Sequence, residues 1–192
     1  KVDRDLEKKY SKEFVITYVG NTSKRRGLLT VIDSLKIIQK TIPNIKLLII
    51  GKSSFDQVIK DKIKQNQIEK LVDFIGWIKE SDIPNYLSIS ELGLSPLHKN
   101  IHHDTTYANK VFQYISFGCP IVSSNVIAQS ELVNKYKIGV IFKDNNAFDL
   151  SEKIIELHND KNLYNRLKQN CLDSIKKLNN SVISNQLISI YE

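Results

Sequence analysis

Six short apolar runs, rich in Val and Ile, alternate along the chain with segments of helical periodicity. The runs span residues 14–19, 45–50, 71–75, 92–95, 120–123 and 138–142. Most lack strict apolar–polar alternation, which is typical of parallel strands covered on both faces. Between them, apolar residues recur at helical spacing, most clearly at Leu28, Val31, Ile32, Leu35 and Ile38. This order predicts an α/β protein with a doubly wound, six-stranded parallel sheet, in which ligands bind at the carboxyl ends of the strands.

The pattern changes after the sixth run. Only helical segments follow, at about 147–159, 161–178 and 182–190, and Asn159 and Asp160 mark a break between the first two. Residues 1–12 are polar, and we expect them to form a tail or linker. We therefore expect one domain over residues 13–192, with extra helices at its C-terminal end.

Composition is that of an ordinary globular protein. The 192 residues suit one domain with a sizeable core, and 41% are hydrophobic and 26% charged. No apolar run approaches the ~18 residues of a membrane span, and the first residues lack the apolar core of a signal peptide. We expect a cytoplasmic protein, with the inner face of the membrane as an alternative site. Cys119 and Cys171 lack metal-ligand spacing, which predicts two buried thiols.

The chain is basic, with 28 Lys and Arg against 21 Asp and Glu and a net charge of +7. Such a charge favours anionic partners, which include nucleotide phosphates, an anionic membrane surface and nucleic acid. No run of five basic residues and no known nucleic-acid-binding pattern occurs. We therefore expect no nucleic-acid partner, and a solvated, lysine-rich surface accounts for most of the excess.

Residues 108–122 predict a short helix that ends at a glycine and leads directly into a buried strand. The first amides of such a helix have no intrahelical partner and suit a phosphate, and Lys110 adds a full charge there. Lys110 and Gln113 share one face of the helix, because they are three residues apart. The face that we expect to pack on the sheet comprises Val111, Tyr114 and Ile115.

A second candidate anion site follows the first strand, where Gly20 leads into a basic loop and then a helix. The loop reads Gly-Asn-Thr-Ser-Lys-Arg-Arg-Gly over residues 20–27. Glycine lets the backbone turn sharply and approach a ligand, and the next helix begins beside three basic residues. The segment lacks G-x-G-x-x-G and G-x-x-x-x-G-K-[ST], so it predicts neither a dinucleotide fingerprint nor a P-loop. A solvated basic loop is the alternative interpretation.

Gly76 and Trp77 close the third strand. A planar indole just past a strand end is suited to covering a nucleobase. The alternative is that Trp77 caps the core, since tryptophan is mostly buried in proteins.

His98, His102, His103 and Asp104 form the one cluster of potential metal ligands. Because they lack a regular helical pair, we expect a mobile polar loop near the cleft and no metal. A histidine there is suited to contact a sugar hydroxyl or a phosphate. Neither a G-x-S-x-G elbow nor an activated cysteine is present, so nucleophilic catalysis is not indicated.

Together, these motifs resemble a known family. Segments 20–27, 46–51, 72–76, 83–86, 94–97, 109–114 and 118–122 are similar to the C-terminal, nucleotide-binding domain of GT-B glycosyltransferases. The closest similarity is to the group 1 (GT4-like) enzymes of bacterial surface-polysaccharide synthesis. It runs from about residue 14 to the end, where residues 186–192 resemble the terminal helix of that family. The resemblance implies a Rossmann-like fold.

The resemblance also implies a sugar-nucleotide site. Its residues are Gly20, Asn21, Arg25, Arg26, Gly76, Trp77, Thr105, Ala108, Asn109, Lys110 and Gln113. Arg25 and Arg26 would hold the diphosphate, the loop at Trp77 would border the base, and Lys110 would meet phosphate or sugar.

The chain departs from the family at Gln113, Thr105 and Asn21. Gln113 stands where the family has a glutamate that binds the ribose hydroxyls. A carboxylate can accept hydrogen bonds from both hydroxyls, whereas an amide offers one acceptor and one donor. Thr105 replaces a glutamate that contacts the donor sugar, and Asn21 stands where arginine is common.

The function implied by the resemblance is transfer of a sugar from a UDP- or GDP-sugar to a glycan or lipid-linked acceptor. The family works without a cofactor or bound metal, and retention of configuration follows from the GT4 resemblance alone. Acceptor site and catalytic groups belong to an N-terminal domain, which we expect to be missing from this chain. We therefore expect no catalytic residue here and no activity of the fragment alone.

Three alternatives remain open. The departures at Gln113, Thr105 and Asn21 favour a non-catalytic sugar-nucleotide binder on the same fold. A GT-B-like sugar-nucleotide epimerase has the same donor site. A basic adaptor for membrane or nucleic acid is favoured by charge alone.

Overall fold

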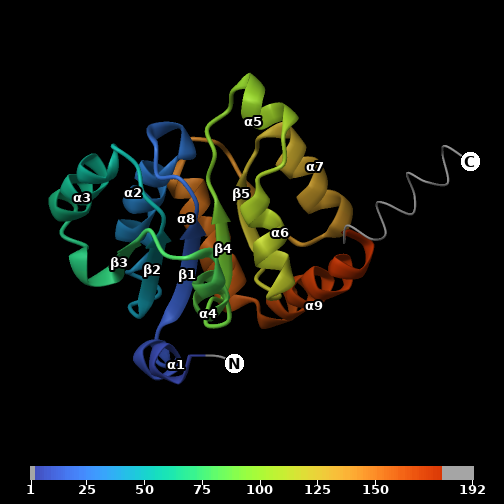
Figure 1. Cartoon of the computed structure of the whole chain (residues 1–192), viewed down its shortest axis with the longest axis horizontal. Helices are drawn as coiled ribbons and strands as arrows, with labels where there is room; N and C mark the ends of the chain where they lie inside the picture. Colours follow the sequence, from blue (N-terminus) through green and yellow to red (C-terminus); the bar gives the residue numbers. More distant parts are fainter. Residues whose placement is uncertain (1–2, 179–192) are drawn as a thin grey trace, which may run out of the picture.

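The sheet has six parallel strands in the order β3-β2-β1-β4-β5-β6 (Figure 1). The computed structural model describes residues 3–178. The strands are β1 (Phe14–Val19), β2 (Ile45–Ile50), β3 (Val72–Gly76), β4 (Leu92–Ser95), β5 (Ile121–Ser124) and β6 (Gly139–Phe142). All five strand pairs are parallel, so the predicted doubly wound, six-stranded sheet is confirmed.

Helices cover both faces of the sheet (Figure 1). The α-helices in the described part are α1 (Arg4–Tyr10), α2 (Leu28–Ile38), α3 (Asp56–Gln65), α4 (Ile83–Leu87), α5 (Ile101–Thr105), α6 (Asn109–Ser116), α7 (Ile127–Tyr136), α8 (Ala147–Asn159) and α9 (Lys161–Leu178). Three short 3₁₀ segments are η1 (Lys24–Arg26), η2 (Glu69–Leu71) and η3 (Glu80–Asp82). The predicted helices at 147–159 and 161–178 are confirmed, whereas 182–190 lies outside the described residues. Over residues 3–178, none of the helices combines the length and apolarity needed to span a bilayer.

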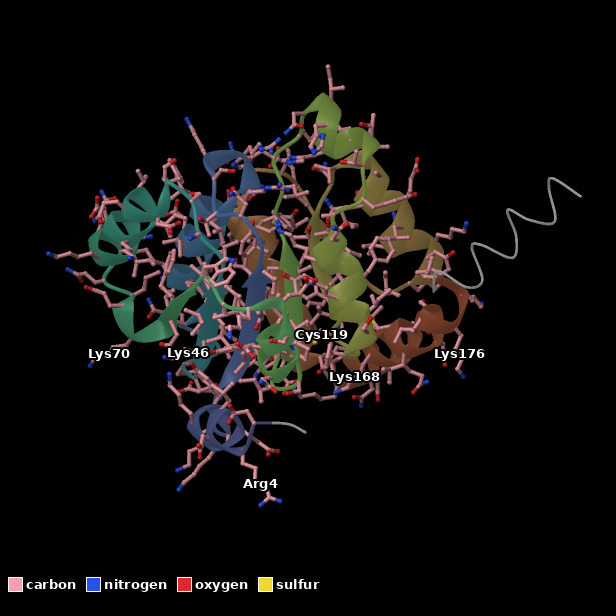
Figure 2. The ribbon with its side chains drawn as sticks, viewed as in Figure 1. Arg4, Lys46, Lys70, Cys119, Lys168 and Lys176 are labelled. Atoms are coloured by element: carbon pink, nitrogen blue, oxygen red, sulfur yellow. The ribbon has the colours of Figure 1, made fainter. Side chains whose placement is uncertain are left out.

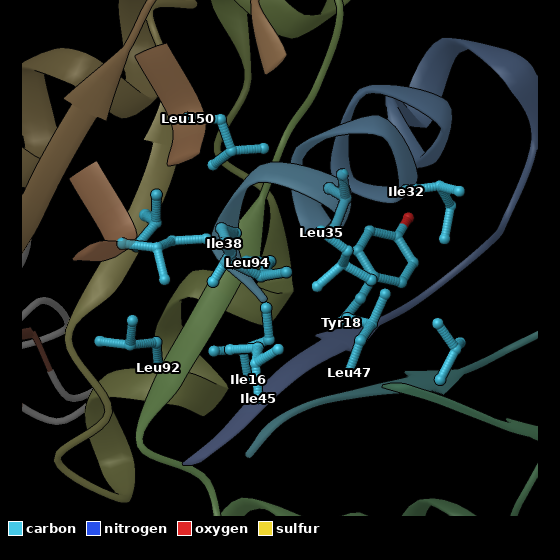
Figure 3. Close-up of a cluster of buried hydrophobic side chains, with 14 of the residues drawn as sticks. Ile16, Tyr18, Ile32, Leu35, Ile38, Ile45, Leu47, Leu92, Leu94 and Leu150 are labelled. Atoms are coloured by element: carbon cyan, nitrogen blue, oxygen red, sulfur yellow. The ribbon is translucent and has the colours of Figure 1, made fainter. Parts of the chain in front are cut away.

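Each face of the sheet carries its own hydrophobic core. Side chains of α2, α3 and α8 pack with one set of strand residues, and those of α6, α7 and α9 pack with another. Figure 3 shows the first core, where Leu35 and Ile38 of α2 lie over Ile16 of β1 and Leu94 of β4. All six residues of β1 are buried, which explains why its sequence does not alternate.

The N-terminal segment differs from the expected polar tail, because it contains helix α1. Asp3 caps the helix by accepting from the amides of Asp5 and Leu6. Tyr10 is buried, and its hydroxyl donates to Oδ2 of Asp73 at 2.6 Å. Lys9 lies 2.9 Å and Lys46 lies 3.6 Å from the same carboxylate. In Figure 2, Lys46 is at the lower end of the sheet, above α1. The helix could not be recognised from its polar composition, because the carboxylate that anchors it, Asp73, lies on β3.

A tyrosine hydroxyl bridges the ends of the two central strands, β1 and β4. The register of β1 on β4 comprises only Ile16 with Leu92 and Thr17 with Gly93. Beyond that point the hydroxyl of Tyr114, on α6, accepts from the amide of Val19 at 2.9 Å and donates to the carbonyl of Leu94 at 3.0 Å. The β1–β4 ladder thus ends at the place where the strand order reverses, and the phenol supplies the backbone partners that the ladder no longer provides.

Both thiols are free and buried, as predicted (Figure 2 labels Cys119). Burial raises the pKa of Cys119 and of Cys171 to about 12. Only the thiolate reacts with alkylating agents, so we expect no labelling of the native chain by iodoacetamide at pH 8 and labelling of both cysteines in denaturant. Mass spectrometry counts the adducts. Rapid labelling of the native chain would contradict the packing of α9 described above.

Candidate functional site

A cavity of about 370 Å³ opens at the carboxyl ends of β1 and β4, where the strand order reverses. Ligands of doubly wound sheets bind in this position. Val19 and Gly20 at the end of β1 form one wall, and Leu97 lies beyond β4. The remaining wall comes from α5, the turn after it and the first residues of α6, and comprises His102, His103, Thr106, Tyr107, Ala108, Asn109, Lys110 and Gln113; the lining is completed by Asn21 and Arg26.

Helix α6 begins at the cavity. Ala108 is its N-cap in an extended conformation and offers no side-chain cap, so the first amides of the helix have no such partner. Asn109 is exposed, and Gln113 is half-buried one turn further on. Val111, Tyr114 and Ile115 are buried against the sheet, as the helical pattern predicted. The helix therefore has an anion-compatible start and an apolar anchor.

Lys110 is the most unusual side chain of the cavity. It is 6% exposed, and its Nζ has no hydrogen-bond partner among the described residues. The ammonium lies 3.9 Å from the centroid of the Tyr18 ring. Burial, reinforced by the charge of Arg26, holds the pKa of Lys110 well below its ordinary value. A buried cation without an anionic partner is costly, which makes this position suited to an anionic ligand.

Arg26 supplies a second cation. It ends η1, and its Nε is also buried without a partner among the described residues. Arg25, which was expected to share the diphosphate, is exposed and lies outside the cavity lining. Its carbonyl accepts from the amide of His98 at 3.0 Å, so its backbone joins the basic loop to the segment after β4. The structure therefore brings Arg26 and Lys110 to one cavity and leaves Arg25 outside its lining.

Glycines join the ends of the first three strands. The amide of Gly20 donates to the carbonyl of Ile50 at 2.9 Å, and the amide of Gly51 donates to the carbonyl of Gly76 at 2.7 Å. Gly51 has φ +138°, and a Cβ there would lie 1.9 Å from the carbonyl oxygen of Gly20. Only glycine fits this crossing. Gly51 was missing from the predicted site because its partner is a distant backbone atom.

A second cavity, of about 520 Å³, lies beside the first over the ends of β1, β2 and β3. The two share Val19, Gly20 and Asn21 in their linings. Trp77 lines the second cavity and is 65% exposed, so it does not cap the core. Lys52 lies 5.7 Å from the centroid of the indole. An exposed planar ring thus lines one of two neighbouring cavities, and Lys110 and Arg26 line the other.

Two of the departures from the family have local structural uses. The side-chain oxygen of Asn21 accepts from the amide of Ser23 at 2.9 Å and shapes the loop. The hydroxyl of Thr105 donates to the carbonyl of Ile101 at 2.8 Å, and the side chain is exposed and outside the cavity lining. Of these departures, Gln113 and Asn21 line the cavity, whereas Thr105 does not.

The histidine segment was expected to be a mobile loop, but residues 101–105 form α5. Asn100 caps the helix by accepting from the amide of His103 at 2.9 Å. Asp104 accepts from the amide of Ile127 at 3.0 Å, which ties α5 to the start of α7. His98 lies 2.8 Å from the carboxylate of Asp144. The Asn100 cap is local, whereas the ties of Asp104 and His98 join residues far apart in the sequence.

Within residues 3–178, His, Cys, Asp and Glu side chains nowhere gather in threes close enough to hold a metal ion. His98, His102 and His103 therefore do not form a joint site. His103 is buried and lines the cavity, whereas His98 is outside its lining.

Fold and cavity define a doubly wound α/β domain whose ligand site lies at the switch point of the sheet. The family model for "Glycosyl transferases group 1" matches residues 1–172, and the chain belongs to this family. It is 27% identical to the capsular polysaccharide biosynthesis glycosyltransferase CapM of Staphylococcus aureus, over 97% of the chain and 49% of CapM. It is 24% identical to spore coat protein SA of Bacillus subtilis, over 93% and 48%. The chain spans about half the length of these curated relatives.

Solved structures share the fold. Anabaena HepE in complex with UDP superposes with a TM-score of 0.85 at 17% identity, covering 97% of the chain and 51% of HepE. The C-terminal domain of the group 1 glycosyl transferase LpcC from Francisella tularensis gives a TM-score of 0.75 at 17% identity, covering 92% of each chain. The expected GT-B C-terminal fold is thereby confirmed.

Proposed function

We propose that this chain is the donor-binding half of a glycosyltransferase, which holds a nucleoside diphosphate sugar for transfer to a glycan or lipid-linked acceptor. The observation that carries the proposal is the presence of two cationic side chains in one cavity at the switch point of the sheet. Lys110 is buried and Arg26 is half-buried, and the Nζ of the first and the Nε of the second have no hydrogen-bond partner among residues 3–178. Family membership and the UDP bound in the HepE structure support the same ligand class.

The two cavities suggest how the donor lies. The base would sit against the indole of Trp77, which is exposed and lines the second cavity. The diphosphate would cross the shared wall at Gly20 and meet Lys110, Arg26 and the first amides of α6. The sugar would then occupy the part of the first cavity bounded by α5.

The chemistry expected of this half is leaving-group stabilisation. As the sugar–phosphate bond breaks, negative charge grows on the nucleoside diphosphate. Lys110, Arg26 and the α6 amides would stabilise that charge in a partly dry site, as fixed cations and dipoles do. The acceptor and the groups that activate it would come from another domain. Retention of configuration and a role in surface-polysaccharide synthesis remain part of the proposal.

Arg26→Gln should weaken UDP binding about 10- to 100-fold, because it removes a charge-assisted hydrogen bond to phosphate worth roughly 1.5–3 kcal/mol. Calorimetric titration of this chain with UDP measures the effect. Lys24→Gln is the matched control, because Lys24 is an exposed cation of the same 3₁₀ turn outside the cavity lining. Arg25→Gln tests the other arginine that the resemblance assigned to the diphosphate, and because Arg25 is exposed and outside the cavity lining, UDP affinity should change little. Equal affinities for wild type and Arg26→Gln would refute the phosphate assignment.

A non-catalytic binder is the alternative that Gln113 favours, since an amide lines the cavity where a ribose-gripping carboxylate was expected. Turnover by the full-length protein with a panel of sugar nucleotides separates the two. Nucleotide binding without turnover of any donor would favour the binder.

A further inference from the structure

The first cavity contains one more unpartnered polar atom, and it differs in kind from the two cations. His103 is 1% exposed and lines the cavity, and its Nε2 is buried without a hydrogen-bond partner among residues 3–178. An uncompensated buried polar atom costs free energy, so each such atom in a ligand cavity indicates a group that the ligand supplies.

The bonds of His103 determine what Nε2 can do. Nδ1 lies 2.8 Å from the carbonyl oxygen of His98, and a carbonyl only accepts, so Nδ1 carries the proton. The side-chain oxygen of Asn100 accepts from the His103 amide at 2.9 Å, so its Nδ2 faces the ring and lies 2.9 Å from Nδ1 and 3.0 Å from the His98 carbonyl. An unprotonated Nδ1 would accept from this amide but would set its lone pair against the carbonyl oxygen at 2.8 Å, so we assign the proton to Nδ1 and the Asn100 Nδ2 donor to the carbonyl. In the neutral ring Nε2 is then an acceptor, at the edge of the ring away from the 98–100 segment.

The surroundings keep the ring neutral. Burial, with the positive charges of Arg26 and Arg25 as further causes, lowers the pKa of His103. A neutral imidazole with its proton on Nδ1 cannot donate from Nε2 to a phosphate. The group that it binds must therefore be a hydrogen-bond donor.

Resting on the proposed function, we propose that His103 is a specificity-determining residue whose Nε2 accepts a hydrogen bond from a hydroxyl of the transferred sugar. Cations at Lys110 and Arg26 beside an acceptor at His103 match a ligand that carries phosphate next to a polyol. The transferred sugar is favoured over the ribose because His103 lies in the first cavity, whereas the exposed indole that would stack the base lines the second. The exposed side chains of His102, Thr106 and Tyr107 line the same cavity.

A pair of variants tests the assignment by calorimetry with UDP-glucose and UDP as probes. His103→Asn places an amide near the position of Nδ1 and removes the acceptor at Nε2, so it should weaken UDP-glucose about 3- to 10-fold and leave UDP unchanged. His103→Gln carries an amide oxygen near the position of Nε2 and should recover part of the UDP-glucose affinity. His158→Asn is the control, because His158 packs on Phe14 from α8, outside both cavities.

Nitrogen NMR of the wild-type imidazole provides a reading that does not depend on any variant folding. We expect Nε2 to stay unprotonated throughout and to shift on addition of UDP-glucose but not of UDP. Equal losses for the two probes, an Nε2 that becomes protonated, or an Nε2 signal indifferent to UDP-glucose would each overturn the assignment. Failure of UDP itself to bind would instead overturn the proposed function, and the inference with it.

Discussion

Replacing Lys110 by Met is expected to make the unliganded chain more stable and at the same time to weaken its binding of UDP about 10- to 100-fold. The gain in stability, about 1–2 kcal/mol, comes from removing a buried charge that has no anionic partner. The loss in affinity comes from removing the charge-assisted hydrogen bond that the phosphate would receive. Opposite signs for stability and binding distinguish a ligand-binding lysine from a structural one.

The same lysine gives the chain a pH dependence whose sign follows from linkage. The pKa of Lys110 is lowered in the folded chain, so between that value and the ordinary 10.5 the unfolded chain binds the extra proton. The free energy of unfolding therefore rises with pH through this window. Lys110→Met should lack this contribution. UDP binding should reverse the shift, because a phosphate next to Nζ favours the charged form.

Thermal denaturation across pH, with and without UDP, measures both effects. Lys135→Met is the matched control, since Lys135 also lies over a tyrosine ring, that of Tyr136 at 5.5 Å, but is exposed. It should leave stability and affinity unchanged. A Lys110→Met chain that is less stable than wild type would show that the ammonium is already compensated, and the anion-site interpretation would then lose its main support.

Tyr114→Phe is expected to destabilise the chain by about 2–4 kcal/mol. The change deletes only an oxygen, but it leaves the amide of Val19 and the carbonyl of Leu94 buried without partners at the point where β1 and β4 separate. For a chain of this length the loss corresponds to a fall in melting temperature of roughly 5–15 °C. UDP affinity should fall as well, because Val19 and Gly20 form a wall of the cavity.

Denaturant unfolding of Tyr114→Phe beside Tyr136→Phe checks this. Tyr136 is half-buried on α7, and its hydroxyl bonds to none of the described residues, so its removal should cost little. If both variants unfold alike, the phenol bridge is not what holds the two strand ends at the switch point.

The fold could be predicted because its signals are local. Unbroken apolar runs such as residues 45–50 and the helical spacing of residues 28–38 each identify an element without reference to the rest of the chain. Helix α1 was missed because its anchors, Tyr10 and Lys9, bind a carboxylate on β3. Helix α5 was missed although Asn100 is a local cap, because the helix is only five residues long and polar, and Asp104 holds it through the amide of Ile127.

The candidate site was predicted only in part, because local signals place a residue near the site but do not give its burial or its partners. Lys110 and Arg26 were expected from their positions at a helix start and a basic loop, and the structure brings them to one cavity. That Lys110 is buried and unpartnered could not be foreseen, since it depends on Tyr18 and Gly20 packing around it. His103 could not be separated from His98 and His102 by sequence, because only the His98 carbonyl identifies its tautomer.

Titration of this chain with UDP, GDP and ADP, followed by ¹H–¹⁵N NMR, tests the central claim most directly. The account predicts that at least one of the three nucleotides binds, with the largest amide shifts at Gly20, Asn109 and Lys110, around the cavity between β1 and β4. If none of the three nucleotides shifted the signals of these amides, the proposed nucleotide site would be contradicted.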